Sequence, residues 1–165
     1  MKRLFALLTL LLTTTLSVEA QSVRLGERIP DIHTDSELGK EFELATKEYV
    51  YMVFVHSKSK PSLNLVDEID SVDPELLSNI DVVLVTTEDI DDNADIVKRF
   101  DDNIFPIAYD LERRTCRNFG INYVPFGVVY DTKRKRALWF GSSLPFEVEE
   151  VVSQIYNTSS LKPTK

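Results

Sequence analysis

Two apolar stretches dominate the middle of the chain. Residues 49–55 are uninterrupted and rich in β-branched and aromatic side chains, and residues 80–85 repeat the pattern with one break at Asp81. Such runs are typical of strands that are covered on both faces. Between them, apolar residues recur at helical spacing: Leu65, Val66, Ile69, Val72 and Leu76. The strand–helix–strand order predicts a right-handed βαβ unit with a parallel strand pair.

The second half of the chain predicts shorter elements. A helix over 91–100 is expected behind an acidic start that includes Glu88 and Asp89, because carboxylates favour a helix N-terminus. A strand over 104–109 and a helix over 112–119, ended by Gly120, follow. Strands over 126–130 and 137–140 form a hairpin. A last helix is expected to bury four apolar residues: Val148, Val151, Val152 and Ile155. The order of all these elements predicts an α/β sandwich with a mixed central sheet.

The first twenty residues have the pattern of a secretory signal. Lys2 and Arg3 precede an apolar run over 4–12, and Val18 and Ala20 are small enough for signal-peptidase cleavage. The run is shorter than the roughly 20 apolar residues that span a bilayer. We therefore expect a signal peptide at 1–20, a domain at 21–157 and a flexible tail at 158–165. Cleavage near Ala20 would leave a periplasmic or secreted protein; the alternative is an N-terminal membrane anchor.

Charge and composition limit the partners and cofactors that the chain is expected to bind. The formal net charge of -8 argues against a nucleic-acid partner, which requires a basic face. With two histidines and one cysteine, no metal or other cofactor is expected. Cys116 can form no internal disulfide, and we expect it to be a small buried hydrophobe. The alternative is a redox-sensing thiol. If Cys116 were exposed, three nearby arginines would lower its pKa: Arg113, Arg114 and Arg117.

Five short motifs, in order, carry a resemblance to a known superfamily. The chain resembles the thioredoxin-like superfamily, in its TlpA-like and peroxiredoxin-like branch. The resemblance implies a three-layer α/β/α sandwich and a cis-proline at Pro125 that faces the active site. The motifs are Leu25-Gly26, Ile29-Pro30-Asp31-Ile32, the segment 38–44 with its Gly-Lys turn, Phe105-Pro106 leading to Asp110, and Phe119-Gly120 leading to Val124-Pro125.

The family's redox loop, Trp-Cys-x-x-Cys, is altered in this chain. The matching segment after the first long strand reads Lys58-Ser59-Lys60-Pro61-Ser62. Serines therefore occupy both cysteine positions, and Lys58 replaces the tryptophan. Disulfide exchange needs a thiolate, and a serine hydroxyl is a far weaker acid that forms no persistent disulfide. The resemblance thus implies a domain without the redox pair and with no catalytic residue at this loop.

The predicted function is a non-catalytic module that binds a protein or an extended peptide. In the family, the residue before the cis-proline offers backbone hydrogen bonds to an extended chain, and this surface needs no cysteine. The alternative is a thiol-disulfide oxidoreductase or a peroxidase-family enzyme with an unconventional site. Apart from the degenerate positions Ser59 and Ser62, the predicted groove is lined by His56, Lys58, Lys60, Pro61, Val124 and Pro125.

Two further sequence patterns each have an alternative functional interpretation. Ser57 and Lys60 match a Ser-x-x-Lys spacing, which would supply a nucleophile and a base, although the partner motifs of that enzyme class are absent. Residues 133–136 form a basic run at a hairpin tip. We expect a solvated turn there, and the alternative is a contact with acidic partners or a membrane surface.

Overall fold

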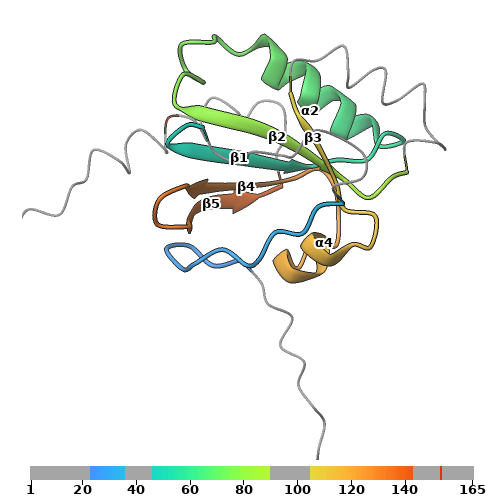
Figure 1. Ribbon diagram of the computed structural model, residues 1–165. Coiled ribbons are helices and arrows are strands. Elements are labelled where there is room, and N and C mark those ends of the chain that lie inside the picture. Colours follow the sequence, from blue (N-terminus) through green and yellow to red (C-terminus); the bar gives the residue numbers. More distant parts are fainter. Residues whose placement is uncertain (1–22, 36–45, 90–104, 143–152, 154–165) are drawn as a thin grey trace, which may run out of the picture.

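The computed structural model describes residues 23–35, 46–89, 105–142 and 153. These segments form one five-stranded sheet and two helices (Figure 1). The elements are β1 (Tyr49–Phe54), α2 (Lys60–Ser71), β2 (Ile80–Thr86), β3 (Ile107–Tyr109), α4 (Arg114–Phe119), β4 (Phe126–Asp131) and β5 (Arg136–Gly141).

The sheet is mixed and has β1 at its centre. The strand order is β3-β2-β1-β4-β5. β1 pairs with β2 in parallel, with Phe54 opposite Val85, and β2 pairs with β3 in parallel. β4 runs antiparallel to both β1 and β5. The predicted βαβ unit, the hairpin and the α/β sandwich with a mixed sheet are therefore confirmed.

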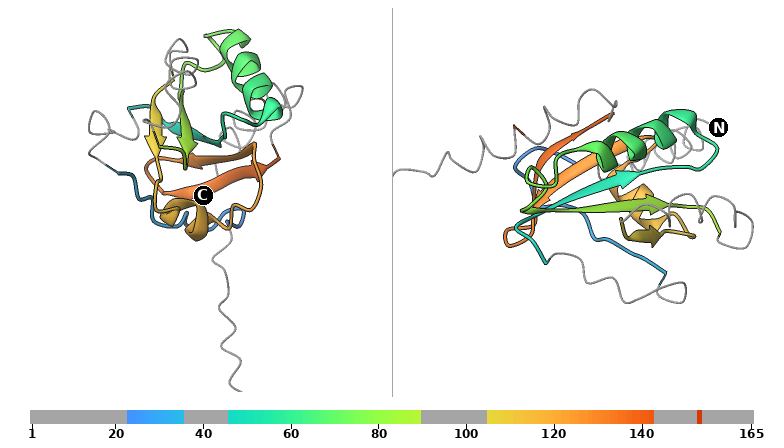
Figure 2. Two further views of the ribbon diagram at one scale, coloured as in Figure 1. Left: turned by 90° about the vertical axis from the view of Figure 1, so that its right-hand side faces the viewer. Right: turned by 90° about the horizontal axis from the view of Figure 1, so that it is seen from above.

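Each face of β1 supports a separate hydrophobic core. All six β1 residues are buried. Tyr49, Tyr51 and Val53 pack in the cluster that contains the α2 residues Leu65, Val66 and Ile69. The alternate residues Val50, Met52 and Phe54 pack in the cluster that contains Cys116 and Phe119 of α4. Figures 1 and 2 accordingly show α2 on one side of the sheet and α4, with the N-terminal segment, on the other.

Three element boundaries differ from the predicted ones. α2 ends at Ser71, and Leu76 is 38% exposed outside it, because Pro74 disfavours helical geometry at the preceding residue. β3 begins at Ile107 and not at residue 104, since Pro106 has no N–H to give to the ladder. α4 begins at Arg114, because Arg113 has a left-handed backbone with φ of 56°.

The N-terminal segment is fixed to the face that α4 covers. Thr115, which is fully buried, accepts a hydrogen bond from the His33 N–H at 2.8 Å and donates to the His33 carbonyl at 2.6 Å. The buried Asp110 carboxylate accepts the N–H groups of Thr115 and Cys116 at 3.1 and 2.8 Å. One buried carboxylate therefore orders the start of α4, and α4 in turn holds the extended segment in place.

Several predictions concern residues outside the described part of the chain. These are the signal peptide, the helix over 91–100 and the tail at 158–165. Of the predicted last helix only Ser153 is described, and it is helical. Within the described segments, none of the helices has the length and apolarity needed to cross a membrane.

Thr115→Val is expected to lower the free energy of unfolding by about 1–3 kcal/mol, because it removes two hydrogen bonds between the buried Thr115 hydroxyl and the His33 backbone. Urea unfolding measures the change. The matched control is Thr46→Val, whose exposed hydroxyl donates to Asp81 and should contribute little. Equal effects of the two substitutions would contradict this account of the N-terminal segment.

Candidate functional site

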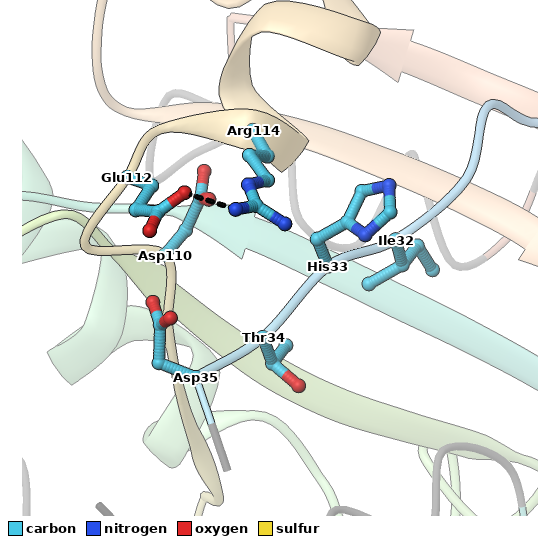
Figure 3. A pocket seen from close by; sticks show the side chains of 7 residues that line it. All are labelled: Ile32, His33, Thr34, Asp35, Asp110, Glu112 and Arg114. Carbon is cyan, nitrogen blue, oxygen red and sulfur yellow. Dashed lines mark ion pairs between the residues drawn. The ribbon is translucent and has the colours of Figure 1, made fainter. Parts of the chain in front are cut away.

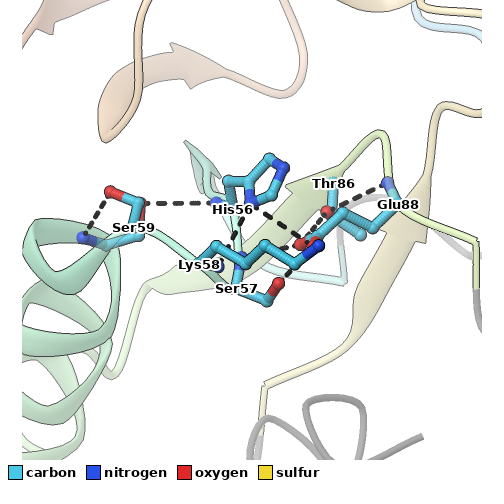
Figure 4. Close-up of polar contacts among 7 residues, drawn as sticks. His56, Ser57, Lys58, Ser59, Thr86 and Glu88 are labelled. Atoms are coloured by element: carbon cyan, nitrogen blue, oxygen red, sulfur yellow. Dashed lines mark hydrogen bonds and ion pairs between the residues drawn. The ribbon is translucent and has the colours of Figure 1, made fainter. Parts of the chain in front are cut away.

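The loop between β1 and α2 is held by its own serines (Figure 4). Ser59 is the N-cap of α2, and its hydroxyl oxygen accepts the Ser62 N–H at 3.3 Å. The Ser59 N–H donates to the His56 carbonyl at 2.9 Å. Ser62 is fully buried, and its hydroxyl oxygen accepts the His56 N–H at 3.3 Å. The two serines therefore serve as hydrogen-bonding groups of a helix start.

A carboxylate from the neighbouring strand fixes the same loop. Glu88 follows β2, and its carboxylate accepts the Ser57 N–H at 2.6 Å and the Ser57 hydroxyl. The Thr86 hydroxyl donates to the same group at 3.2 Å. Only 9% of the Glu88 side chain is exposed. Glu88 thus joins the carboxyl ends of β1 and β2, and the helix over 91–100 that it was expected to precede lies outside the described residues.

His56 completes this group. Its Nδ1 lies 3.3 Å from Glu88 Oε1 and 3.1 Å from the backbone nitrogen of Lys58. A neutral Nδ1 accepts the Lys58 N–H, whereas a protonated Nδ1 donates to Glu88. The two contacts exclude each other at one nitrogen, so the hydrogen bonds of the loop depend on whether Nδ1 carries a proton.

The Ser-x-x-Lys pattern forms no nucleophile–base pair. Ser57 is buried, and its hydroxyl donates to Glu88. Lys60 is exposed at the first residue of α2. The Ser57 hydroxyl therefore donates to a carboxylate and helps to orient the loop. Within the described segments it forms no hydrogen bond with Lys60.

The segment after α4 lies against this loop. The Val124–Pro125 peptide bond is cis, as the resemblance implied. A cavity of about 120 Å³ has Val124 and His56 among its lining residues. Among the described residues, none forms a hydrogen bond with the backbone of Val124. Within the described segments, the Val124 N–H and carbonyl are therefore without a protein partner.

The predicted groove residues divide into two sets. The structure brings His56 and Val124 together at one cavity. Ser59 and Ser62 lie at the start of α2 beside Lys58, Lys60 and Pro61, which are exposed. Pro125 is buried and directly precedes β4. The sequence did not predict that Glu88 and Thr86 belong to the site, or that Ser57 forms hydrogen bonds with Glu88. One signal for them exists: Ser57 and Glu88 follow neighbouring parallel strands, and the carboxyl ends of such strands lie at the same edge of a sheet.

Cys116 lines the cavity, and its thiol is protonated at physiological pH. Burial raises the pKa of its thiol to about 12, and the hydrogen bond to Asp110 and the charge of Asp110 add to the rise. Arg113 and Arg117 lower the pKa by less. The expectation of a small buried hydrophobe is confirmed by its 5% exposure.

A second hollow, of about 270 Å³, lies between the N-terminal segment and α4 (Figure 3). Its charged groups already have partners within the fold. Glu112 pairs with Arg114, and Asp35 accepts the Leu111 N–H at 2.8 Å. Asp110 binds the first amides of α4. In the described segments, no group of three or more His, Cys, Asp or Glu side chains is arranged to hold a metal ion.

The order of the strands, the cis-proline after α4 and the helix that follows the central strand together decide the fold. The chain has a thioredoxin-like fold. Its structural neighbours include thiol:disulfide interchange and peroxiredoxin-like proteins. The amino-acid sequence matches no family model and no curated protein sequence.

Three solved structures illustrate the similarity. A protein from Chlorobium tepidum described as the thiol:disulfide interchange protein DsbE has a TM-score of 0.67 and 20% identity, over 82% of this chain and 98% of that one. Peroxidoxin BcpB from Mycobacterium tuberculosis has a TM-score of 0.68 and 13% identity, over 82% and 98%. A thioredoxin-like protein from Bacteroides caccae has a TM-score of 0.63 and 14% identity; the match covers 81% of this chain but only 50% of that longer one. These identities establish the fold alone.

The Cys116 thiol is expected to react with a thiol reagent near neutral pH at least about a hundredfold more slowly than a free cysteine, whose pKa is roughly 8.5. The reason is its burial and its pKa of about 12. Reaction with a chromogenic disulfide before and after unfolding in urea measures the difference. Fast reaction of the folded protein would show that the thiol is accessible.

Proposed function

We propose that this chain is an exported, thioredoxin-like binding module that holds an extended peptide or a segment of a partner protein without thiol chemistry. The carrying observation is the loop at the start of α2, where Ser59 and Ser62 hold the helix start with hydroxyl groups. The signal-like pattern of residues 1–20 supports export.

The hydroxyl groups of this loop have a structural role that does not require ionisation. The Ser59 oxygen satisfies a free N–H at the first turn of α2, which typically stabilises a helix by about 1 kcal/mol. Thiolate chemistry would need a low-pKa cysteine at this position. The single cysteine of the chain, Cys116, is a buried lining residue of the neighbouring cavity, and its pKa is raised. Both facts favour a binding role over disulfide exchange or peroxide reduction.

The backbone beside Pro125 supports the peptide-binding part of the proposal. Val124 has both backbone groups free among the described residues and lies next to a cavity. An extended chain placed there would pair with Val124 as an added strand does, and its side chains would fill the cavity alternately. Pro125 itself offers no N–H, so the pairing would be limited to Val124 on that side of the bond.

The purified protein is expected to reduce insulin disulfides no faster than buffer containing dithiothreitol alone. Serine at both loop positions removes the attacking and the resolving thiol. Turbidity from the released insulin chain measures the rate, with a conventional thioredoxin as the positive control. Catalysis above the dithiothreitol background would contradict the proposal of a redox-inactive module.

Peptide binding is tested by trapping with Ser59→Cys. Ser59 is partly exposed, and Ser62 remains a serine, so a mixed disulfide at position 59 cannot be resolved. The probe is a peptide whose cysteine carries a thionitrobenzoate leaving group. The Cys thiolate attacks the peptide sulfur, the new S–S bond forms and thionitrobenzoate departs. We expect the trapped peptide to slow hydrogen exchange of the Val124 N–H.

The matched control is Ser71→Cys, at the exposed far end of α2. It should trap the same peptide without slowing exchange at Val124. Equal exchange rates at Val124 in the two trapped complexes would mean that the groove does not hold an extended chain.

A further inference from the structure

The cavity beside Val124 is lined mainly by apolar residues. Five of its lining residues are buried in the protein: Phe54, Val55, Val85, Cys116 and Ile121. Its volume of about 120 Å³ is comparable with the roughly 150 Å³ apolar cavity that binds benzene in an engineered protein. The size and the lining therefore suit one branched aliphatic side chain.

Arg113 places a positive charge on the rim of this cavity. Arg113 is exposed and lines the cavity together with His56. Its charge lowers the pKa of the Cys116 thiol, which lines the same cavity. None of the carboxylates in the described segments forms an ion pair with it.

Two acidic groups that follow β2 and β3 already have partners within the described segments. Glu88 binds Ser57 and Thr86, and Asp110 is buried against the first amides of α4. The net charge of -8 is spread over the whole chain, and its distant part is screened within about 8 Å at physiological ionic strength. An acidic group that reaches the rim would therefore meet Arg113 as an unpaired cation.

The backbone of Arg113 gives a second reason to assign a role to its side chain. Its φ of 56° lies in the left-handed region, which glycine adopts without the cost that other residues incur. The backbone bonds there, from the Arg113 N–H to the Asp110 carbonyl and from the Arg117 N–H to the Arg113 carbonyl, need no side chain. The guanidinium has no partner within the described fold that would explain its presence.

We propose that the cavity selects the bound segment: a valine, isoleucine or leucine side chain enters it, and an aspartate or glutamate beside that residue pairs with Arg113. This inference rests on the proposed function, because the segment is the extended chain held at Val124. It adds a specificity that the fold alone does not have.

The test is selection from a displayed library of random octapeptides against the full-length protein. We expect enrichment of peptides with an aliphatic residue next to an acidic one. Enrichment of peptides without an acidic residue would overturn this inference and leave the peptide-binding function intact. No enrichment at all would count against both.

Selected peptides are then measured by fluorescence anisotropy against variants. Arg113→Gln and Arg113→Gly should each weaken binding about tenfold or more, as expected for loss of a charge-assisted hydrogen bond. Arg134→Gln, at the hairpin turn at the other end of β4, makes the same charge change and should leave affinity unchanged. Arg113→Gly should keep or raise the thermal midpoint because it suits the backbone. Unchanged affinity in both Arg113 variants would refute the pairing.

Discussion

Burial of β1 on both faces is the constraint on which the rest of the structure depends. Alternate residues of this strand enter two separate cores, one with α2 and one with α4. A shift of one residue in the pairing of β1 would move each set of alternate side chains into the wrong core. The burial of β1 therefore fixes the register of its pairing with the neighbouring strands. The fixed register also fixes where the strand ends, and the loop from His56 to Ser62 begins at that point.

The loop is then defined by contacts between the ends of neighbouring strands. Glu88 bridges from β2 to Ser57, and Ser59 closes the first turn of α2. These bonds form with neutral hydroxyl groups and a carboxylate whose oxygens are largely occupied. A loop that holds its shape in this way can present a surface without a redox change, as the proposed function requires.

The sequence predicted the central strands and the hairpin because long apolar runs leave little choice of structure. It failed where one residue overrides a pattern. Pro74 ends α2 although Val72 and Leu76 continue the helical spacing. Arg113 delays α4 through a left-handed backbone that its residue type does not suggest.

The site was less predictable than the fold because its contacts join residues far apart in the sequence. Glu88 stands among other acids, and this local pattern favoured a helix cap over a bridge to Ser57, which lies 31 residues away. The cavity is lined by residues of β1, β2 and the segment after α4, so it could be predicted only once the arrangement of these parts was known. The cis bond at Pro125, by contrast, followed from a short motif carried by the resemblance.

The central claim is that Ser59 and Ser62 occupy the positions of the redox cysteines in thioredoxins. The most direct measurement is the titration and oxidation of the double variant Ser59→Cys/Ser62→Cys. Residue 59 caps a helix of 12 residues and accepts the Ser62 N–H, so a thiolate there would be stabilised. We predict that the Cys thiol introduced at 59 has a pKa below the roughly 8.5 of a free cysteine and that the two thiols form an intramolecular disulfide. A folded variant whose two thiols titrate normally and never pair would contradict the claim.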